Sequence, residues 1–275
     1  MLKLTERTEP VVWSKGIHTP LNARQLDDYE RQGYLFIEDF FAIQEVDDLN
    51  ERTRMIADRR PENAIFESQD GELRFLLGIH NDDLFKKYAR NRFIVDAARQ
   101  ILDADVYIYQ SKVVPKGAFL GKEIPFHSDY DVWHHVDGLP APRIMNAAIF
   151  LTDQEIFNGA LMVVPGSHKY FLRVHRHRIP GDKDKFHIAD LRRRRQDRID
   201  REEFRMIVKQ NGFDCLTGPK GSILFWDANL IHGSTNNISP FERSMLYFTY
   251  NRITNKPANP VRPGFMVDRD HEVIG

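Results

Sequence analysis

The 275-residue sequence has a single cysteine, Cys215, and therefore forms no internal disulfide. One thiol suits a reducing compartment better than secretion, so we expect a cytoplasmic protein. No apolar run approaches the roughly 18 residues that a membrane-spanning helix requires. The stretch from Met1 to Pro10 also lacks the apolar segment of a signal peptide. We therefore expect neither membrane insertion nor export.

The chain also lacks an excess of charge of either sign. Its formal net charge is −1, whereas a general nucleic-acid binder is usually strongly basic. Hydrophobic residues make up 41% and charged residues 29% of the chain, a balance that allows a sizeable buried core. The length suits one large β-barrel or sandwich wrapped by helices, so we expect residues 1–275 to form a single domain.

Helical patterns dominate the first part of the chain. Asn22 and Gln25 are spaced as a capping box at the start of a helix. Gly33 is expected to end this helix before the apolar stretch Tyr34 to Ile37, which we expect to form a strand. Apolar residues then recur at helical spacing in two further segments, 46–56 and 93–102. We expect a helical N-terminal part over about residues 1–104.

After Asp105 the pattern changes to short β-branched and aromatic runs, separated by turn-forming pairs such as Asn158-Gly159. This pattern is typical of an antiparallel barrel or jelly roll rather than a βαβ repeat. We expect a mainly β fold with flanking helices, in which residues 105–275 form a double-stranded β-helix (jelly-roll, cupin-like) core. The expected strands are 106–114, 144–151, 161–164, 222–226 and 245–250.

One positively charged stretch interrupts the predicted strands. Between residues 169 and 209, Lys and Arg are twice as numerous as Asp and Glu, and Arg192 to Arg195 form an uninterrupted run. Three interpretations stay open for this basic insert: a solvated helical face with ion pairs, a lid that helps hold an anionic cosubstrate, and a nucleic-acid contact. We expect an excursion from the barrel rather than a second domain.

The candidate metal ligands lie at a strand end and at a distant turn. His127-Ser128-Asp129 supplies an imidazole and a carboxylate, and His232 follows the predicted strand 222–226. Two imidazoles and one carboxylate form the facial triad of non-haem iron oxygenases, which leaves positions open for a chelating cosubstrate and dioxygen. We expect His127, Asp129 and His232 to bind Fe(II) and to be the catalytic residues.

The His-x-Asp triplet alone is a weak signal, because His80-Asn81-Asp82 has the same form. There, Asn81 or Asp82 is explained more simply as the N-cap of a following helix. The downstream set is stronger because Arg243 opens a predicted strand shortly after His232. Its guanidinium, if it points into the barrel, is suited to the distal carboxylate of 2-oxoglutarate. Taken separately, His232 could be a buried histidine of the barrel core, and Arg243 could form an ion pair at the surface. The joint pattern of these residues favours an iron site.

Several segments together resemble the phytanoyl-CoA dioxygenase superfamily of iron- and 2-oxoglutarate-dependent oxygenases, and within it bacterial ectoine hydroxylases most of all. The similarity runs from about Glu9 to Phe265. It implies Fe(II), 2-oxoglutarate and dioxygen as cofactor and cosubstrates, and a reaction that begins as hydroxylation, because Asp129 keeps the carboxylate that related halogenases lack. The segments are Pro10-Val11-Val12-Trp13, Pro20 to Gly33, Ala97 to Gln110, His127 to Pro140, Asn158 to Tyr170, Thr217 to Gly221 and His232 to Asn251.

The resemblance also implies roles for individual residues. Contacts to 2-oxoglutarate fall on Arg243, Ser234 and Lys112. At the position of Lys112, ectoine hydroxylases usually have Arg. Lysine keeps the charge but loses the planar fork. Three further positions match the ectoine-contacting set, although each also fits a structural role in a sheet, the core or the surface. These are Gln110, Trp133 and Arg262.

Other positions depart from the family pattern. Two polar residues are replaced by valine, and a site built for hydrogen bonding selects strongly for the matching group on its ligand. We therefore expect a reshaped pocket with a different polar pattern, in which Val114 and Trp226 contact the substrate. The departures are Leu77 for Phe, Val114 for Asn, Val132 for Thr, Trp226 for Phe, and Ile124-Pro125-Phe126 for an aromatic-rich stretch.

Three functions stay open from the sequence. The first is an enzyme that hydroxylates a small zwitterionic or amino-acid-like metabolite, either ectoine or a different amino-acid or natural-product substrate. The second is a non-catalytic metal-binding sensor, against which Arg243 counts. The third is a nucleic-acid- or protein-modifying oxygenase that uses the basic insert and binds in a salt-sensitive way. The first predicts a small-molecule partner, with neither membrane nor nucleic acid, and leaves a homodimer open.

Overall fold

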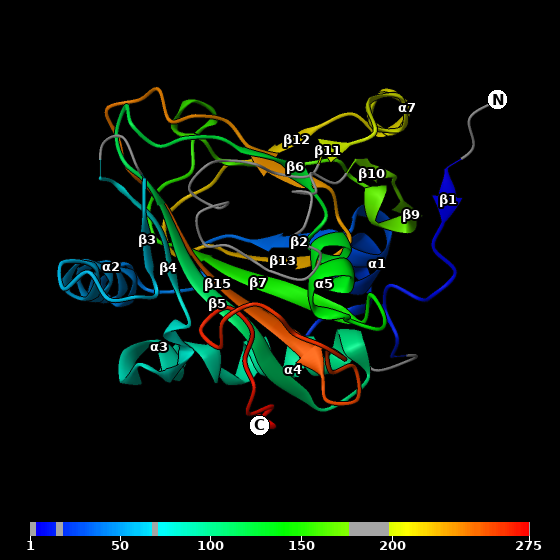
Figure 1. Ribbon diagram of the computed structural model, residues 1–275, viewed down its shortest axis with the longest axis horizontal. Coiled ribbons are helices and arrows are strands. Elements are labelled where there is room, and N and C mark those ends of the chain that lie inside the picture. The colour runs from blue at the N-terminus through cyan, green and yellow to red at the C-terminus, as the bar shows by residue number, and fades with distance from the viewer. Residues whose placement is uncertain (1–3, 15–18, 68–70, 176–197, 275) are drawn as a thin grey trace.

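The computed structural model describes residues 4–14, 19–67, 71–175 and 198–274. Two antiparallel sheets lie one above the other at its centre (Figure 1). The larger has the strand order β2-β13-β7-β15-β5-β4-β3, and the smaller has the order β12-β8-β14-β6. Two opposed sheets of this kind are what a double-stranded β-helix core requires.

The five strands expected after residue 105 are all present, with small shifts at their ends. The larger sheet contains β2 (Tyr34–Ile37), β13 (Ile223–Asp227), β7 (Ile144–Phe150), β15 (Arg243–Arg252), β5 (Val106–Lys116), β4 (Leu73–Leu77) and β3 (Ala64–Phe66). The smaller contains β12 (Asp214–Leu216), β8 (Leu161–Val163), β14 (His232–Ser234) and β6 (Ile124–His127). Two short pairs join β1 (Thr5–Glu6) to β9 (Tyr170–Phe171) and β10 (Val174–His175) to β11 (Arg198–Ile199).

The helices lie mainly outside the sheets, and Figure 1 shows α3 and α4 on the face of the larger sheet that points away from the smaller one. Their apolar residues form the main core with that sheet. No described helix is both long and apolar enough to cross a membrane. The α-helices are α1 (Ala23–Gln32), α2 (Ile43–Ala57), α3 (Asp83–Ala89), α4 (Arg92–Leu102), α5 (Asp129–Asp137) and α7 (Arg201–Asn211), and the short 3-10 helices are η1 (Ile79–Asn81), η2 (Ile156–Asn158) and η3 (Ser167–Lys169).

The predicted capping box begins α1. The Asn22 side chain accepts a hydrogen bond from the backbone N–H of Gln25, and the Gln25 side chain accepts one from the N–H of Asn22, each at 3.0 Å. Gly33 ends the helix with φ 87°, and a side chain there would collide with the ring of His168 at 2.3 Å. Glycine at this position therefore allows the sharp turn into β2.

The expectation of a helical part over residues 1–104 is incomplete. β2, β3 and β4 lie within that range and form the two ends of the larger sheet, where β2 pairs with β13 and β4 pairs with β5. The strand expected at residues 34–37 is confirmed as β2, whereas β3 and β4, with three and five residues, were not predicted. A segment this short has too few residues for a period of two to stand out from the neighbouring helical pattern.

Most of the predicted basic insert, including Arg192 to Arg195, lies outside the described residues. Its two ends are described, and Val174 of β10 pairs with Ile199 of β11. The chain therefore leaves and returns at neighbouring positions, and the excursion from the barrel remains a prediction. The solvated-face, lid and nucleic-acid interpretations all remain predictions.

Candidate functional site

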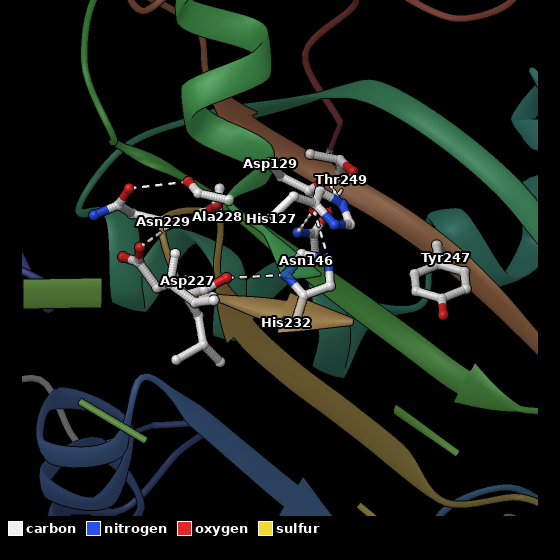
Figure 2. Close-up of polar contacts among 12 residues, drawn as sticks. His127, Asp129, Asn146, Asp227, Ala228, Asn229, His232, Tyr247 and Thr249 are labelled. Atoms are coloured by element: carbon white, nitrogen blue, oxygen red, sulfur yellow. Dashed lines mark hydrogen bonds and ion pairs between the residues drawn. The ribbon is translucent and has the colours of Figure 1, made fainter. Parts of the chain in front are cut away.

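The three predicted iron ligands converge between the two sheets (Figure 2). His127 ends β6 and His232 begins β14, and the two residues are directly opposite each other in this antiparallel pair. Asp129 is the first residue of α5, which Ser128 caps. One ligand atom from each of the three side chains lies within 4.8 Å of the others, and the described part of the chain contains no other such group.

The two histidines present the same nitrogen to this point. Nδ1 of His127 lies 2.8 Å from the Pro125 carbonyl, and Nδ1 of His232 lies 2.9 Å from the Leu230 carbonyl. Because a carbonyl only accepts, each Nδ1 carries the proton and each Nε2 keeps a free lone pair. The Nε2 atoms of His127 and His232 lie 3.5 and 3.7 Å from the carboxylate oxygens of Asp129. These are the atoms expected to bind a metal.

The charges at the site also suit a divalent cation. Burial and the neighbouring His127 lower the pKa of His232 to about 4, so its imidazole is neutral near pH 7. Although burial opposes ionisation, His232, His127 and Lys112 hold the pKa of Asp129 well below its usual range. Two imidazoles and one carboxylate are the donor set of a non-haem iron site, so these residues fit the metal.

Two buried polar residues orient Asp129 from the larger sheet. Asn146 of β7 donates to Asp129 Oδ2 at 3.0 Å, and Thr249 of β15 donates to Asn146 Oδ1 at 2.6 Å (Figure 2). Such partners fix the position and the basicity of a ligand. The sequence analysis missed this chain of hydrogen bonds. The available signal was Asn146 itself, the one strongly polar residue in the apolar strand Ile144–Phe150.

The other His-x-Asp triplets have structural roles. His80 contacts the Ser111 hydroxyl at 2.8 Å, and Asp82 caps α3 as expected. A third triplet that the sequence analysis overlooked, His135-Val136-Asp137, lies within α5. There Asp137 accepts hydrogen bonds from other side chains in the core. The pairing of β6 with β14, rather than the triplet spacing, therefore distinguishes the triad.

A cavity of about 300 Å³ lies beside the triad. Most of the predicted cosubstrate and substrate residues line it, which places them within reach of one bound molecule. They are Lys112, Ser234, Gln110, Trp133, Arg262 and Val114, together with the altered positions Leu77, Ile124 and Val132. Lining residues that the sequence analysis missed include Phe75, Asp131, Leu161, Tyr247 and Met266.

Two predicted contact residues are not among those that line the cavity. Trp226 is fully buried, and its ring packs edge-on against His232 and Tyr247, with centroid distances of 5.9 and 5.5 Å. Arg243 is 1% exposed, and its Nε donates to Gln154 at 2.7 Å. Arg243 lies on the same face of β15 as Tyr247, which lines the cavity, and Trp226 packs on Tyr247, so direct contact remains a prediction for both residues.

Lys112 and Ser234 supply donors for an anion next to His232. Burial lowers the pKa of Lys112, while the nearby Asp129 carboxylate opposes that shift. The hydroxyl of Ser234 is buried and has no hydrogen-bond partner among the described residues. An ammonium group and an unused hydroxyl in one cavity suit a carboxylate ligand, since a buried polar group normally has a partner.

Arg262 belongs to a buried polar cluster at another part of the cavity wall. Its guanidinium donates to Asp137 Oδ2 at 2.7 Å, to the Tyr109 hydroxyl at 3.0 Å and to Gln110 Oε1 at 3.3 Å. Burial lowers the pKa of Arg262, but Tyr109 and Asp137 raise it more. Arg262 is only 4% exposed, which excludes the surface alternative. The sequence analysis missed Tyr109 and Asp137.

Comparison with known proteins identifies the family. The phytanoyl-CoA dioxygenase (PhyH) family matches residues 29–245, which is most of the chain. The chain belongs to the phytanoyl-CoA dioxygenase family. Curated relatives of this PhyH protein include the ectoine dioxygenase of Stutzerimonas stutzeri, 35% identical over 97% of this chain and 90% of that protein. The ectoine dioxygenase of Halomonas elongata is also 35% identical, over 97% of this chain and 82% of its own length.

Solved structures agree with the family assignment. EctD from S. alaskensis with bound Fe superimposes on the PhyH protein with a TM-score of 0.83 at 29% identity, covering 99% of this chain and 92% of that one. EctD from S. alaskensis with 2-oxoglutarate and 5-hydroxyectoine gives a TM-score of 0.82 at 30% identity, and the match covers 97% of this chain and 91% of that one. These matches confirm the predicted fold, the enzyme class of iron- and 2-oxoglutarate-dependent dioxygenases, and the two cofactors. The roles of individual residues remain predictions.

Proposed function

We propose that this PhyH protein couples the oxidation of 2-oxoglutarate to succinate with hydroxylation of a compact zwitterion, ectoine or a closely related metabolite. One observation carries the proposal. A single cavity of about 300 Å³ joins the His127, Asp129 and His232 triad to a buried guanidinium, that of Arg262. A small carboxylate-bearing molecule can therefore be held by one end within reach of the metal.

His127, Asp129 and His232 hold Fe(II), which when bound supplies the activation of dioxygen. Hydrogen bonds from the Nδ1–H groups of the two histidines, and from the Asn146 amide to Asp129, keep the ligands in place before the metal binds. Lys112 pairs with a carboxylate of 2-oxoglutarate, and Ser234 donates its O–H to the same molecule. Arg243, on the same face of β15 as the cavity-lining Tyr247, pairs with the distal carboxylate of 2-oxoglutarate.

The substrate carboxylate binds Arg262, which Asp137 and Tyr109 hold in a fixed orientation. A fixed guanidinium loses little freedom when it pairs with a carboxylate. The ring of Trp133 packs on that of Tyr109, with the ring centroids 5.0 Å apart. It provides an aromatic face for a cationic or delocalised nitrogen of the substrate. The two fixed groups orient the substrate toward the triad.

The aliphatic part of the wall distinguishes this site from one built for many hydrogen bonds. Leu77, Val114, Ile124 and Val132 line the cavity and offer no side-chain donor or acceptor. They exclude water, but they fix the ring of a substrate only by shape. We therefore expect ectoine to be accepted but to compete with related zwitterions, including free amino acids or natural-product intermediates. The small volume disfavours an acyl-CoA thioester.

A succinate-release screen tests the proposal. With Fe(II) and 2-oxoglutarate, we expect ectoine or a related zwitterion to stimulate succinate release, with one oxygen atom gained by the substrate for each succinate formed. The methyl ester of the best substrate is the matched control, because it lacks the carboxylate that Arg262 pairs with, and it should be a poor substrate. Turnover confined to acyl-CoA thioesters or nucleic acid would exclude a zwitterion as the substrate.

A further inference from the structure

The turn that follows β13 holds the first two iron ligands through one serine. Ser128 lies between His127 and Asp129, and its hydroxyl donates to Asn229 Oδ1 at 3.0 Å. Asn229 is itself fixed: its side-chain amide donates to two backbone carbonyls in η3 and β9, and its N–H donates to Asp227 Oδ1 at 2.8 Å. The position of Ser128 therefore depends on this turn.

The same turn holds the third ligand. The Leu230 carbonyl accepts the Nδ1–H of His232 at 2.9 Å, and the Leu230 N–H donates to the Asp227 carbonyl at 2.9 Å. Asp227 is thus connected to the triad by two routes, one through its carboxylate and Asn229 and one through its backbone and Leu230. A shift of Asp227 would move groups that contact all three ligands.

The carboxylate of Asp227 is paired with Arg7, from the N-terminal segment that follows β1. Arg7 Nη1 lies 2.8 Å from Asp227 Oδ2, and the two side chains are 1% and 4% exposed. Nη2 of Arg7 donates to the carbonyls of Pro10 at 2.9 Å and Pro142 at 3.0 Å. One guanidinium therefore joins the N-terminal segment, the start of β7 and the turn that holds the iron ligands.

We propose that Arg7 and Asp227 are a positioning pair for the iron site, through which the N-terminal segment sets the affinity for Fe(II). The inference rests on the proposed function, because it requires that the triad binds this metal. A buried carboxylate that loses its partner must move toward water or find another partner. Such a movement would carry the turn away from Ser128 and His232. Partners outside the ligand set commonly change metal affinity by about 10- to 100-fold.

Anaerobic Fe(II) titration of the full chain, in competition with a chromophoric chelator, tests the positioning pair. We expect Arg7→Gln and Asp227→Asn each to weaken Fe(II) binding by about 10- to 100-fold. Arg7→Lys should weaken it less, because lysine keeps the charge but cannot also bind both proline carbonyls. The double variant Arg7→Gln, Asp227→Asn removes both charges of the pair and leaves neither one buried alone. Its loss of Fe(II) affinity should therefore not exceed that of Arg7→Gln alone.

Arg74→Gln is the matched control. Arg74 forms another buried ion pair, with Glu67, and their side chains are 4% and 8% exposed. Arg74 belongs to β4, which lies toward the opposite end of the larger sheet from β13, so its replacement should leave Fe(II) affinity near the parental value. Equal losses in Arg74→Gln and Arg7→Gln would reduce the Arg7 pair to a general stabilising contact and overturn the proposal.

Ser128→Ala provides a second test if Arg7→Gln does not fold, as judged by near-ultraviolet circular dichroism. This substitution removes the bond to Asn229 and retains the Arg7 pair, and we expect it to weaken Fe(II) binding as well. Parental affinity in folded Arg7→Gln, or in folded Ser128→Ala, would contradict the positioning role. Failure of the parental protein itself to bind Fe(II) would instead contradict the proposed function.

Discussion

Replacing Asp129 with alanine is expected to reduce succinate release by more than about 100-fold, because even residues outside the ligand set commonly change metal affinity by 10- to 100-fold. The substitution removes the only carboxylate of the triad and leaves the two imidazoles as the remaining ligands. Coupled assays of succinate and oxidised substrate measure the effect. His232→Ala should give a similar loss.

The second His-x-Asp triplet offers a matched control for this prediction. Asp82→Asn should retain parental activity, because asparagine also caps a helix and can replace Asp82 at the start of α3. Circular dichroism would establish that each variant is folded. Parental rates of succinate release in both Asp129→Ala and His232→Ala would show that the assigned triad is wrong.

Replacing Arg262 with methionine is expected to lower kcat/KM for the zwitterion by about 30-fold or more, since truncating one partner of a buried charge pair costs about 2–5 kcal/mol or more. The effect should fall mainly on KM, while Fe(II) binding is retained. Asp137, which is 0% exposed, would lose its charged partner, so we also expect the free energy of unfolding to fall by about 3–5 kcal/mol. Steady-state kinetics and chemical denaturation separate the two effects.

Arg143→Met is the control for a lost buried guanidinium. Arg143 is 8% exposed, donates to the Leu102 carbonyl at 2.7 Å and stacks on Trp13, and it does not line the cavity. It should lower stability without raising KM. Should Arg262→Met prove too unstable, Arg262→Lys keeps the charge and loses the fork, and an intermediate KM is expected. A folded Arg262→Met protein with parental KM would contradict the role of Arg262 in carboxylate binding.

The triad could be predicted because its chemistry restricts both residue type and context. Iron requires imidazole and carboxylate ligands, His127 and Asp129 are two residues apart, and His232 follows the predicted strand 222–226. The capping box at Asn22 was similarly visible, since both of its partners lie within one helical turn. Local sequence contains the information for features of this kind.

Contacts that depend on strand register could not be predicted in the same way. Asn146 meets Thr249 only because β7 and β15 pair in one register, and β15 is irregular against β5 between Thr249 and Tyr250. Because a one-residue shift turns a side chain to the opposite face, sequence alone did not show that Asn146 points toward Asp129.

Contacts between remote segments were hidden for a different reason. The Arg7–Asp227 pair joins residues that are 220 positions apart, and neither residue type is unusual in its local sequence. Asp137 was likewise hidden, because its partners Tyr109 and Arg262 lie 28 and 125 positions away in the sequence. Such pairs become visible only when the sheets and helices are assembled.

Anaerobic titration with Fe(II) and then 2-oxoglutarate tests the central claim most directly. We predict one equivalent of Fe(II) per chain, followed by the metal-to-ligand absorption band of the 2-oxoglutarate chelate. The band should be lost in His232→Ala and retained in His80→Ala, since His80 contacts Ser111 and lies outside the triad. A parental protein that gives no such band, or a His232→Ala protein that gives it undiminished, would contradict the assignment of the iron site.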